Sequence, residues 1–236
     1  MTKRRVKVVQ GELDLRERTH GGTREGAGRK RKAGQRDSRH RARPVHKARY
    51  PEHVVLRTLP GVGRLRRAHV YKAVRDAWLR IAQREDFRVV HASIQHNHLH
   101  LIVEAGDAKT LSRGMQALAI ATARAINRSL GRTGKVFAYR YHATALTTPQ
   151  QTRSALAYVL NNWRRHREHV ANLGIDHAPL DTFSTGSAFD GWKQGRLAPP
   201  PGHEPLPSAS PETWLLRVGW RKAGRALDAY AVPGPA

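Results

Sequence analysis

The chain has 236 residues, with 43 lysines and arginines against 18 aspartates and glutamates, and so carries a formal net charge of +25. A charge of this sign and size attracts a polyanion, because phosphate contacts from Lys and Arg supply most sequence-independent nucleic-acid affinity. The absence of cysteine excludes a disulfide framework and a thiolate metal site. No apolar run reaches the length of a membrane span and no signal-peptide pattern is present, so we expect a cytoplasmic, nucleoid-associated bacterial protein.

Residues 1–48 are rich in Arg, Lys and Gly and have few apolar side chains that could form a core. This composition predicts a disordered basic arm that binds DNA. Within it, the run Arg29, Lys30, Arg31 and Lys32 is suited to a DNA minor groove. A solvated tail without a specific ligand is the alternative.

Residues 49–175 carry alternating strand and helix patterns. Apolar and turn residues predict strands over 53–59, 87–94, 98–104 and 135–146, and helices over 66–85, 110–130 and 149–169. Thr110 and Thr148 are the expected N-caps of the second and third helices. The order β-α-β-β-α-β, followed by one more helix, predicts an α+β fold: a ferredoxin-like split βαβ core with an antiparallel sheet and an extra C-terminal helix.

Residues 176–236 change in composition, with Gly, Ser and Pro dominating much of the segment. We expect a tail rather than a further domain. One short amphipathic piece, residues 214–222, either docks on the core or stacks on nucleic acid, and docking is favoured.

The third predicted strand carries two histidines on one face. Because side chains alternate along a strand, His98 and His100 point together while Leu99 and its apolar neighbours point to the opposite side. Two imidazoles at this spacing can hold one divalent metal. His96 and Glu104 share their face, and we expect them to support the metal ligands or to face DNA.

The last predicted helix carries Tyr158 and Asn162 one turn apart, outside an apolar stripe that includes Leu156 and Val159. A tyrosine placed there needs a partner for its hydroxyl or a chemical role. An ordinary amphipathic helix with outward polar residues is the alternative reading. Tyr139 and Tyr141 are rival nucleophiles on a predicted strand, but neither is followed by an asparagine one helical turn later.

These motifs resemble those of the single-tyrosine HUH transposases, and most closely the REP-associated tyrosine transposases. His98-Leu99-His100 resembles the histidine–hydrophobic–histidine motif, and Tyr158-Val159-Leu160-Asn161-Asn162 resembles the segment that carries the nucleophile. The segment from Phe137 to His142 resembles the one that precedes that helix in the family. The resemblance covers about residues 45–170.

The resemblance implies a catalytic domain that cleaves and transfers single-stranded DNA through a 5′-phosphotyrosine link in DNA transposition or recombination. By position, Tyr158 would be the nucleophile, and His98, His100 and Asn162 the ligands of a divalent metal, Mg²⁺ or Mn²⁺. The imidazoles would also suit zinc. The implied partners are single-stranded or hairpin DNA and a second copy of the chain in a homodimer. One departure is Trp163, where the family usually has proline.

Basic residues of the catalytic domain are candidate DNA contacts. We expect this of Arg57, Arg140, Arg164 and Arg165. Two other functions remain open: a DNA-binding protein that derives from a transposase but does not cleave, and an RNA-binding protein, which only the charge supports. Covalent protein–DNA adducts would distinguish the first of these from the enzyme.

Overall fold

The computed structural model describes residues 45–82, 84–166 and 179–234. Residues 1–44 of the predicted basic arm, including Arg29, Lys30, Arg31 and Lys32, lie outside the described residues. No helix among the described residues is long and apolar enough to cross a membrane.

One antiparallel sheet forms the centre of the fold. Its strands are β1 (Glu52–Arg57), β2 (Phe87–Ile94), β3 (His98–Ala105) and β4 (His142–Ala145), in the spatial order β2-β3-β1-β4. β2 and β3 form the hairpin expected from Asn97, and β1 lies between β3 and β4. This strand order, with a helix in each crossover, confirms the predicted ferredoxin-like α+β fold.

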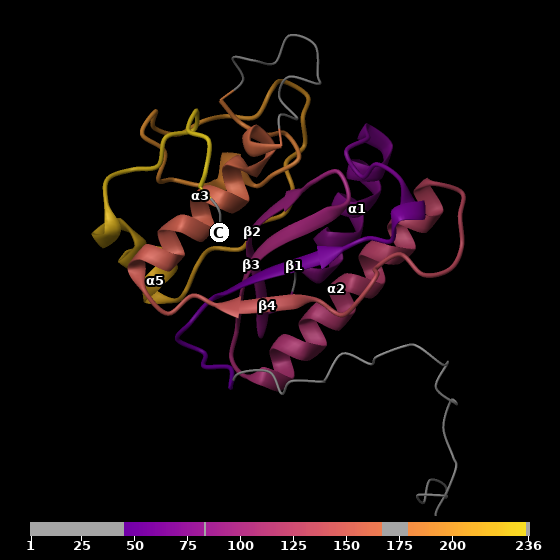
Figure 1. Cartoon of the computed structure of the whole chain (residues 1–236), viewed down its shortest axis with the longest axis horizontal. Helices are drawn as coiled ribbons and strands as arrows, with labels where there is room; N and C mark the ends of the chain where they lie inside the picture. The colour runs from indigo at the N-terminus through magenta and orange to yellow at the C-terminus, as the bar shows by residue number, and fades with distance from the viewer. Residues whose placement is uncertain (1–44, 83, 167–178, 235–236) are drawn as a thin grey trace, which may run out of the picture. The chain divides into compact units, whose positions relative to one another are not determined.

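Two helices cover one face of this sheet, as Figure 1 shows: α1 (Ala68–Ile81) and α2 (Ala108–Ser129). Leu99, Leu101 and Val103 point into the core between the sheet and these helices. α2 approaches β2 closely at Gly114, where an added Cβ would lie 2.1 Å from the Phe87 ring. Only glycine fits at this crossing.

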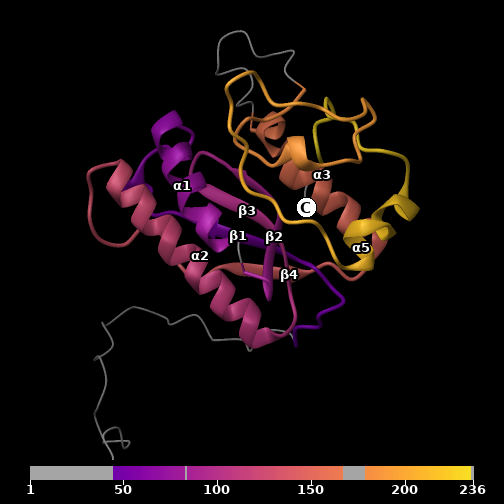
Figure 2. The same cartoon turned by 180° about the vertical axis from the view of Figure 1, so that it is seen from behind.

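The opposite face of the sheet is covered by α3 (Pro149–Arg165) together with parts of residues 180–234 (Figure 2), whereas the stretch 203–206 packs against α1 instead. A second apolar core joins Ile102 of the sheet and Val159 of α3 to Trp192 and Trp220 of the C-terminal segment. That segment contains the short helices α5 (Trp214–Arg217), η2 (Gly186–Ala188) and η3 (Gly219–Ala223), while η1 (Pro60–Val62) follows β1. The amphipathic piece therefore docks on the fold through Leu215, Leu216 and Trp220.

The C-terminal segment also covers the β2 edge of the sheet. Ile94 donates its backbone N–H to the carbonyl of Phe183, and Thr185 donates to the carbonyl of Ala92, both at 2.8–2.9 Å. Further along, the Ala209 amide donates to Val89. An uncovered edge strand exposes unpaired backbone groups, so this segment completes the sheet rather than trailing from it.

Two local predictions were wrong. The second helix is capped by Asp107, whose carboxylate accepts the N–H of Thr110 at 2.7 Å, so the expected cap Thr110 already lies inside the helix. The last strand is four residues long: Phe137 makes only an isolated bridge to Thr58, and β4 begins at His142. By contrast, Thr148 caps α3 as predicted, by accepting the N–H of Gln151.

Candidate active site

The histidine pair lies on the α3 side of the sheet. The rings of His98 and His100 are perpendicular, with 4.6 Å between centroids. The Nδ1 atom of His98 lies 2.8 Å from Oδ1 of Asn97, in the hairpin turn. His100 is buried, and its Nε2 has no hydrogen-bond partner. The strand alternation predicted from the sequence therefore does bring both imidazoles to one face.

Tyr158 reaches this pair from α3. Its ring packs edge-on against His100, with 5.0 Å between centroids and an interplanar angle of 86°. Pro149 and the Thr148 cap start the helix just after β4, so that Tyr158, two turns later, lies over the sheet. Residues separated by nearly sixty positions thus meet in one site.

Asn162 is fully buried on α3, and neither its amide nitrogen nor its amide oxygen has a hydrogen-bond partner. A buried amide without partners carries a free-energy penalty of about 1–3 kcal/mol. In a simple amphipathic helix, a polar residue outside the apolar stripe would face solvent. Asn162 does not, because the C-terminal segment covers α3 from the side away from the sheet. An amide kept in this state is available to a ligand.

Trp163, the residue that replaces the family's proline, is also buried. α3 continues without interruption through this position to Arg165. A proline would remove a backbone donor there, whereas tryptophan keeps the helix regular and adds apolar surface.

A third histidine, to which we had assigned no function from the sequence, completes the cluster. His53 of β1 has its Nε2 3.1 Å from Nδ1 of His100, and the two rings stack with 5.2 Å between centroids. Its ring also lies edge-on to the Tyr158 ring, with 6.0 Å between the two ring centroids. The β1–β3 register brings it there: Val55 pairs with His100, and His53, two residues before Val55, lies on the same face.

The three imidazoles are held in the neutral form. Burial, together with a smaller effect of neighbouring basic side chains, lowers the pKa of His53 and of His98 to about 4. Burial lowers the pKa of His100 to about 2, with additional effects from His98 and His53. Neutral imidazole is the form that binds metals.

A cavity of about 630 Å³ opens beside the tyrosine. Its walls come from β1, β3, β4 and α3, and include both His100 and Tyr158. Its remaining lining residues are His53, Val55, His142, Thr144, Leu146, Gln150, Gln151, Ser154, Ala155 and Arg165. The cavity is large enough for a nucleotide-sized group next to Tyr158.

The donor set fits a divalent cation. Within residues 45–82, 84–166 and 179–234, no group of three or more His, Cys, Asp or Glu side chains is placed to hold a metal. A metal held by His98 and His100 would need a further donor of another kind, such as a neutral oxygen. The amide oxygen of Asn162 and the Nε2 of His100 are both buried without hydrogen-bond partners, and their chemistry would suit that role.

The rival tyrosines lie elsewhere. Tyr139 is 84% exposed in the turn before β4, and Tyr141 packs against the core on the α1–α2 side. Neither ring contacts the histidine pair in the described structure. The geometry favours Tyr158.

The predicted DNA contacts divide into two groups. Arg57, Arg140 and Arg165 are exposed, and Arg165 lines the cavity. Arg164, in contrast, is buried: its Nε donates to the carbonyl of Ala229 at 2.9 Å, and its guanidinium stacks on Trp163 and Tyr230. Arg164 fastens the C-terminal segment to α3 and is buried in the folded chain, whereas a DNA contact by this residue stays a prediction.

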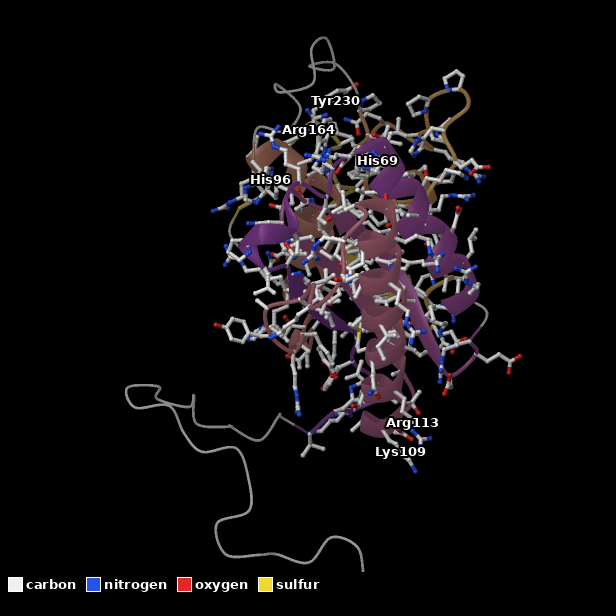
Figure 3. The ribbon with its side chains drawn as sticks, turned by 90° about the vertical axis from the view of Figure 1, so that its right-hand side faces the viewer. His69, His96, Lys109, Arg113, Arg164 and Tyr230 are labelled. Carbon is white, nitrogen blue, oxygen red and sulfur yellow. The ribbon has the colours of Figure 1, made fainter. Side chains whose placement is uncertain are left out.

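Glu104 lies near the far end of β3 from His98 and His100, whereas His96 is close enough to His98 to contribute to the lowered pKa of that imidazole. Glu104 is buried, and its two carboxylate oxygens accept the backbone N–H groups of Glu212 and Thr213, each at 2.8 Å. It therefore anchors the C-terminal segment rather than supporting the histidines. His96 is exposed in the hairpin turn, at the end of the molecule opposite Lys109 and Arg113 (Figure 3).

The fold and the site together define an α+β protein that presents a histidine pair, a tyrosine and a buried amide on one face of a ferredoxin-like sheet. The model of the family described as "Transposase IS200 like" matches residues 46–162, a range that contains all of these residues. The chain belongs to the IS200-like transposases, a family whose role is DNA transposition.

Two solved structures are similar. One, described as a REP-associated tyrosine transposase bound to a REP hairpin, has 16% identity, covers 63% of this chain and 82% of that chain, and has a TM-score of 0.45. The other, a candidate transposase from Deinococcus radiodurans R1, has 13% identity, covers 58% and 97%, and has a TM-score of 0.35. No curated protein matches the chain significantly. Both TM-scores are below 0.5, so the family rests on the match over residues 46–162.

Proposed function

We propose that the chain is a metal-dependent enzyme that cleaves single-stranded DNA and transfers the cut strand through a 5′-phosphotyrosine at Tyr158. The observation that carries this proposal is the contact between Tyr158 and His100, whose ring centroids are 5.0 Å apart. It joins a nucleophile from α3 to a metal-binding imidazole from β3, beside a cavity that can admit DNA.

In the proposed reaction the Tyr158 hydroxyl oxygen attacks a backbone phosphorus and forms a phosphotyrosine bond to the 5′ phosphate of the downstream strand. The bond from that phosphorus to the 3′ oxygen breaks. The phenolic proton passes to solvent, and the departing 3′ oxygen takes up a proton. A 3′ hydroxyl can later attack the phosphotyrosine and release Tyr158, which rejoins DNA without a separate energy source.

His98, His100 and Asn162 would hold the metal. A bound Mg²⁺ or Mn²⁺ would polarise the scissile phosphate and neutralise charge on its oxygens. His98 and His100 are neutral at physiological pH and so are ready to ligate. Arg165, on the cavity wall, is placed to pair with a neighbouring phosphate.

We take the substrate to be hairpin or palindromic repeat DNA with single-stranded flanks, because the motifs resemble those of transposases that act on such repeats. The net charge of +25 suits a polyanion of this kind. The same resemblance points to a homodimer, which light scattering during size-exclusion chromatography would measure.

Covalent capture tests the proposal. Purified protein is incubated with labelled hairpin oligonucleotides, including any palindromic repeats near the encoding locus, with and without Mn²⁺, and run on a denaturing gel. We expect an Mn²⁺-dependent adduct that Tyr158→Phe abolishes without weakening DNA binding. Tyr139→Phe is the matched control, because this exposed tyrosine lies away from the cavity. Adduct formation by Tyr158→Phe would contradict the assignment, and DNA binding without any wild-type adduct would favour a protein that does not cleave.

A further inference from the structure

His53 contacts the histidine pair from the neighbouring strand β1. It lies on β1, where neither the histidine motif nor the tyrosine motif extends. Its Nε2 is 3.1 Å from Nδ1 of His100, and the rings stack at an interplanar angle of 27°. This distance is a hydrogen bond between two imidazole nitrogens.

Only one of the two facing nitrogens can carry the shared proton. A metal ligand needs a lone pair, and the free nitrogen of His100 is the buried Nε2, which has no protein partner. If Nδ1 of His100 donates to His53, Nε2 keeps its lone pair and can bind a metal. The reverse arrangement would leave an N–H at Nε2, buried, unpaired and unable to ligate.

His98 provides an internal precedent for this arrangement. Its Nδ1 lies 2.8 Å from Oδ1 of Asn97. An amide oxygen can only accept, so Nδ1 of His98 carries the proton and Nε2 carries the lone pair. With His53 as the acceptor for His100, both members of the pair would present the same nitrogen, Nε2.

We propose that His53 is a positioning residue: it accepts the Nδ1 proton of His100, fixes the tautomer and ring orientation of that ligand, and so sets the affinity of the site for its metal. This inference rests on the proposed function, since it assumes that His100 binds a metal. Because the His53 ring also contacts Tyr158 at 6.0 Å, the same side chain limits the space open to the nucleophile. Partners of this kind typically contribute about 10- to 100-fold in metal affinity.

Two substitutions separate the hydrogen bond from simple packing. His53→Leu fills similar space but cannot accept a proton. His53→Gln places an amide oxygen near the position of Nε2 and can accept one. We expect His53→Leu to weaken Mn²⁺ binding about 10- to 100-fold and His53→Gln to recover most of that loss.

Isothermal titration of the metal-free protein with Mn²⁺ measures these affinities without DNA. The matched control is His69→Leu, because His69 is exposed on α1, on the opposite side of the sheet from α3. It should bind Mn²⁺ like the wild type. Thermal melting confirms that each variant is folded, and raised Mn²⁺ should restore adduct formation to His53→Leu.

The outcomes distinguish this inference from the proposed function. If His100→Ala loses Mn²⁺ binding while folded His53→Leu binds like the wild type, the role of His53 is wrong and the proposed site stands. If His53→Gln is as weak as His53→Leu, packing rather than proton acceptance is responsible, and the inference fails. If His100→Ala binds Mn²⁺ as tightly as the wild type, the metal site of the proposed function fails first.

Discussion

The two faces of the sheet bury different kinds of side chain. Towards α1 and α2, β3 presents Leu99, Leu101 and Val103 to a continuous apolar core. Towards α3, the same strand presents His98 and His100, whose surroundings include buried polar atoms without partners. Buried polar atoms without partners destabilise a fold, whereas apolar side chains stabilise it. The α1–α2 face therefore holds the main apolar core, and the α3 face carries the candidate active site beside a second apolar core.

The C-terminal segment explains how the α3 face remains folded. Trp192 and Trp220 pack on α3, and Glu104 and Arg164 bind backbone groups of residues 212–229. These contacts lie beside the histidine site rather than in it. The polar site thus lies beside a second apolar core, and the C-terminal part of that core, including Trp192 and Trp220, lies beyond the residues that the family model matches.

The largest effect should follow the loss of a ligand on the α3 face. We expect His100→Ala to reduce the rate of adduct formation by more than about 100-fold. The loss of a residue that only hydrogen-bonds to a metal ligand typically costs up to that factor, and the loss of the ligand itself should cost more. Its unfolding free energy should change by no more than about 1–3 kcal/mol, because only one buried hydrogen bond is lost. Gel assays of the adduct and chemical denaturation measure the two quantities. A variant that retains the wild-type rate would show that the reaction does not depend on the α3 face.

The opposite pattern, a loss of stability without a loss of activity, should follow a substitution one residue away. Leu101→Ala should lower the unfolding free energy by about 2–5 kcal/mol, because Leu101 is completely buried in the core beneath α1 and α2. The rate of adduct formation per folded molecule should stay near that of the wild type. Urea denaturation provides the stability. A large loss of activity in fully folded Leu101→Ala protein would mean that the two faces are not separable.

Stability should depend on pH through the α3 side of the sheet. His91 is buried beside Thr185 and Phe189, and burial lowers its pKa to about 4 from 6.5. Below pH 6.5 the unfolded chain takes up a proton that the folded chain does not, so stability falls as the pH decreases to about 4. A shift of this size corresponds to about 3 kcal/mol for one group. Denaturation of wild type and His91→Phe between pH 4 and 8 measures it, and equal slopes would contradict this origin.

A smaller effect should follow from the anchor of the C-terminal segment. Glu104→Gln keeps the size of the side chain but removes the charge that accepts the amides of Glu212 and Thr213. We expect a loss of about 1–3 kcal/mol, together with faster amide exchange at these two positions. Glu85→Gln, on an exposed side chain, is the control. Unchanged exchange at 212 and 213 would show that the anchor is not needed.

Much of the fold and half of the site follow from local sequence patterns. Alternation along β3 separates His98 and His100 from Leu99, and helical spacing places Asn162 one turn after Tyr158. These relations depend on backbone geometry alone, and the order of the elements is enough to predict the ferredoxin-like topology.

What could not be predicted depends on contacts between distant segments. His53 acquires its place through strand register, and Arg164 is buried because its partner is a carbonyl at Ala229. The packing of Trp192 leaves no periodic signal, because the chain around it is mostly without regular structure. Side chains that bind backbone groups of another segment have no pattern that sequence spacing can reveal.

The central claim is that Tyr158, on the α3 face, forms the covalent link to DNA. Its most direct test is mass spectrometry of the protein after reaction with a hairpin oligonucleotide and Mn²⁺, followed by nuclease and protease digestion. Our account predicts a phosphonucleotide on the peptide that contains Tyr158 and on no other. A linked peptide containing Tyr139 or Tyr141 instead would contradict it.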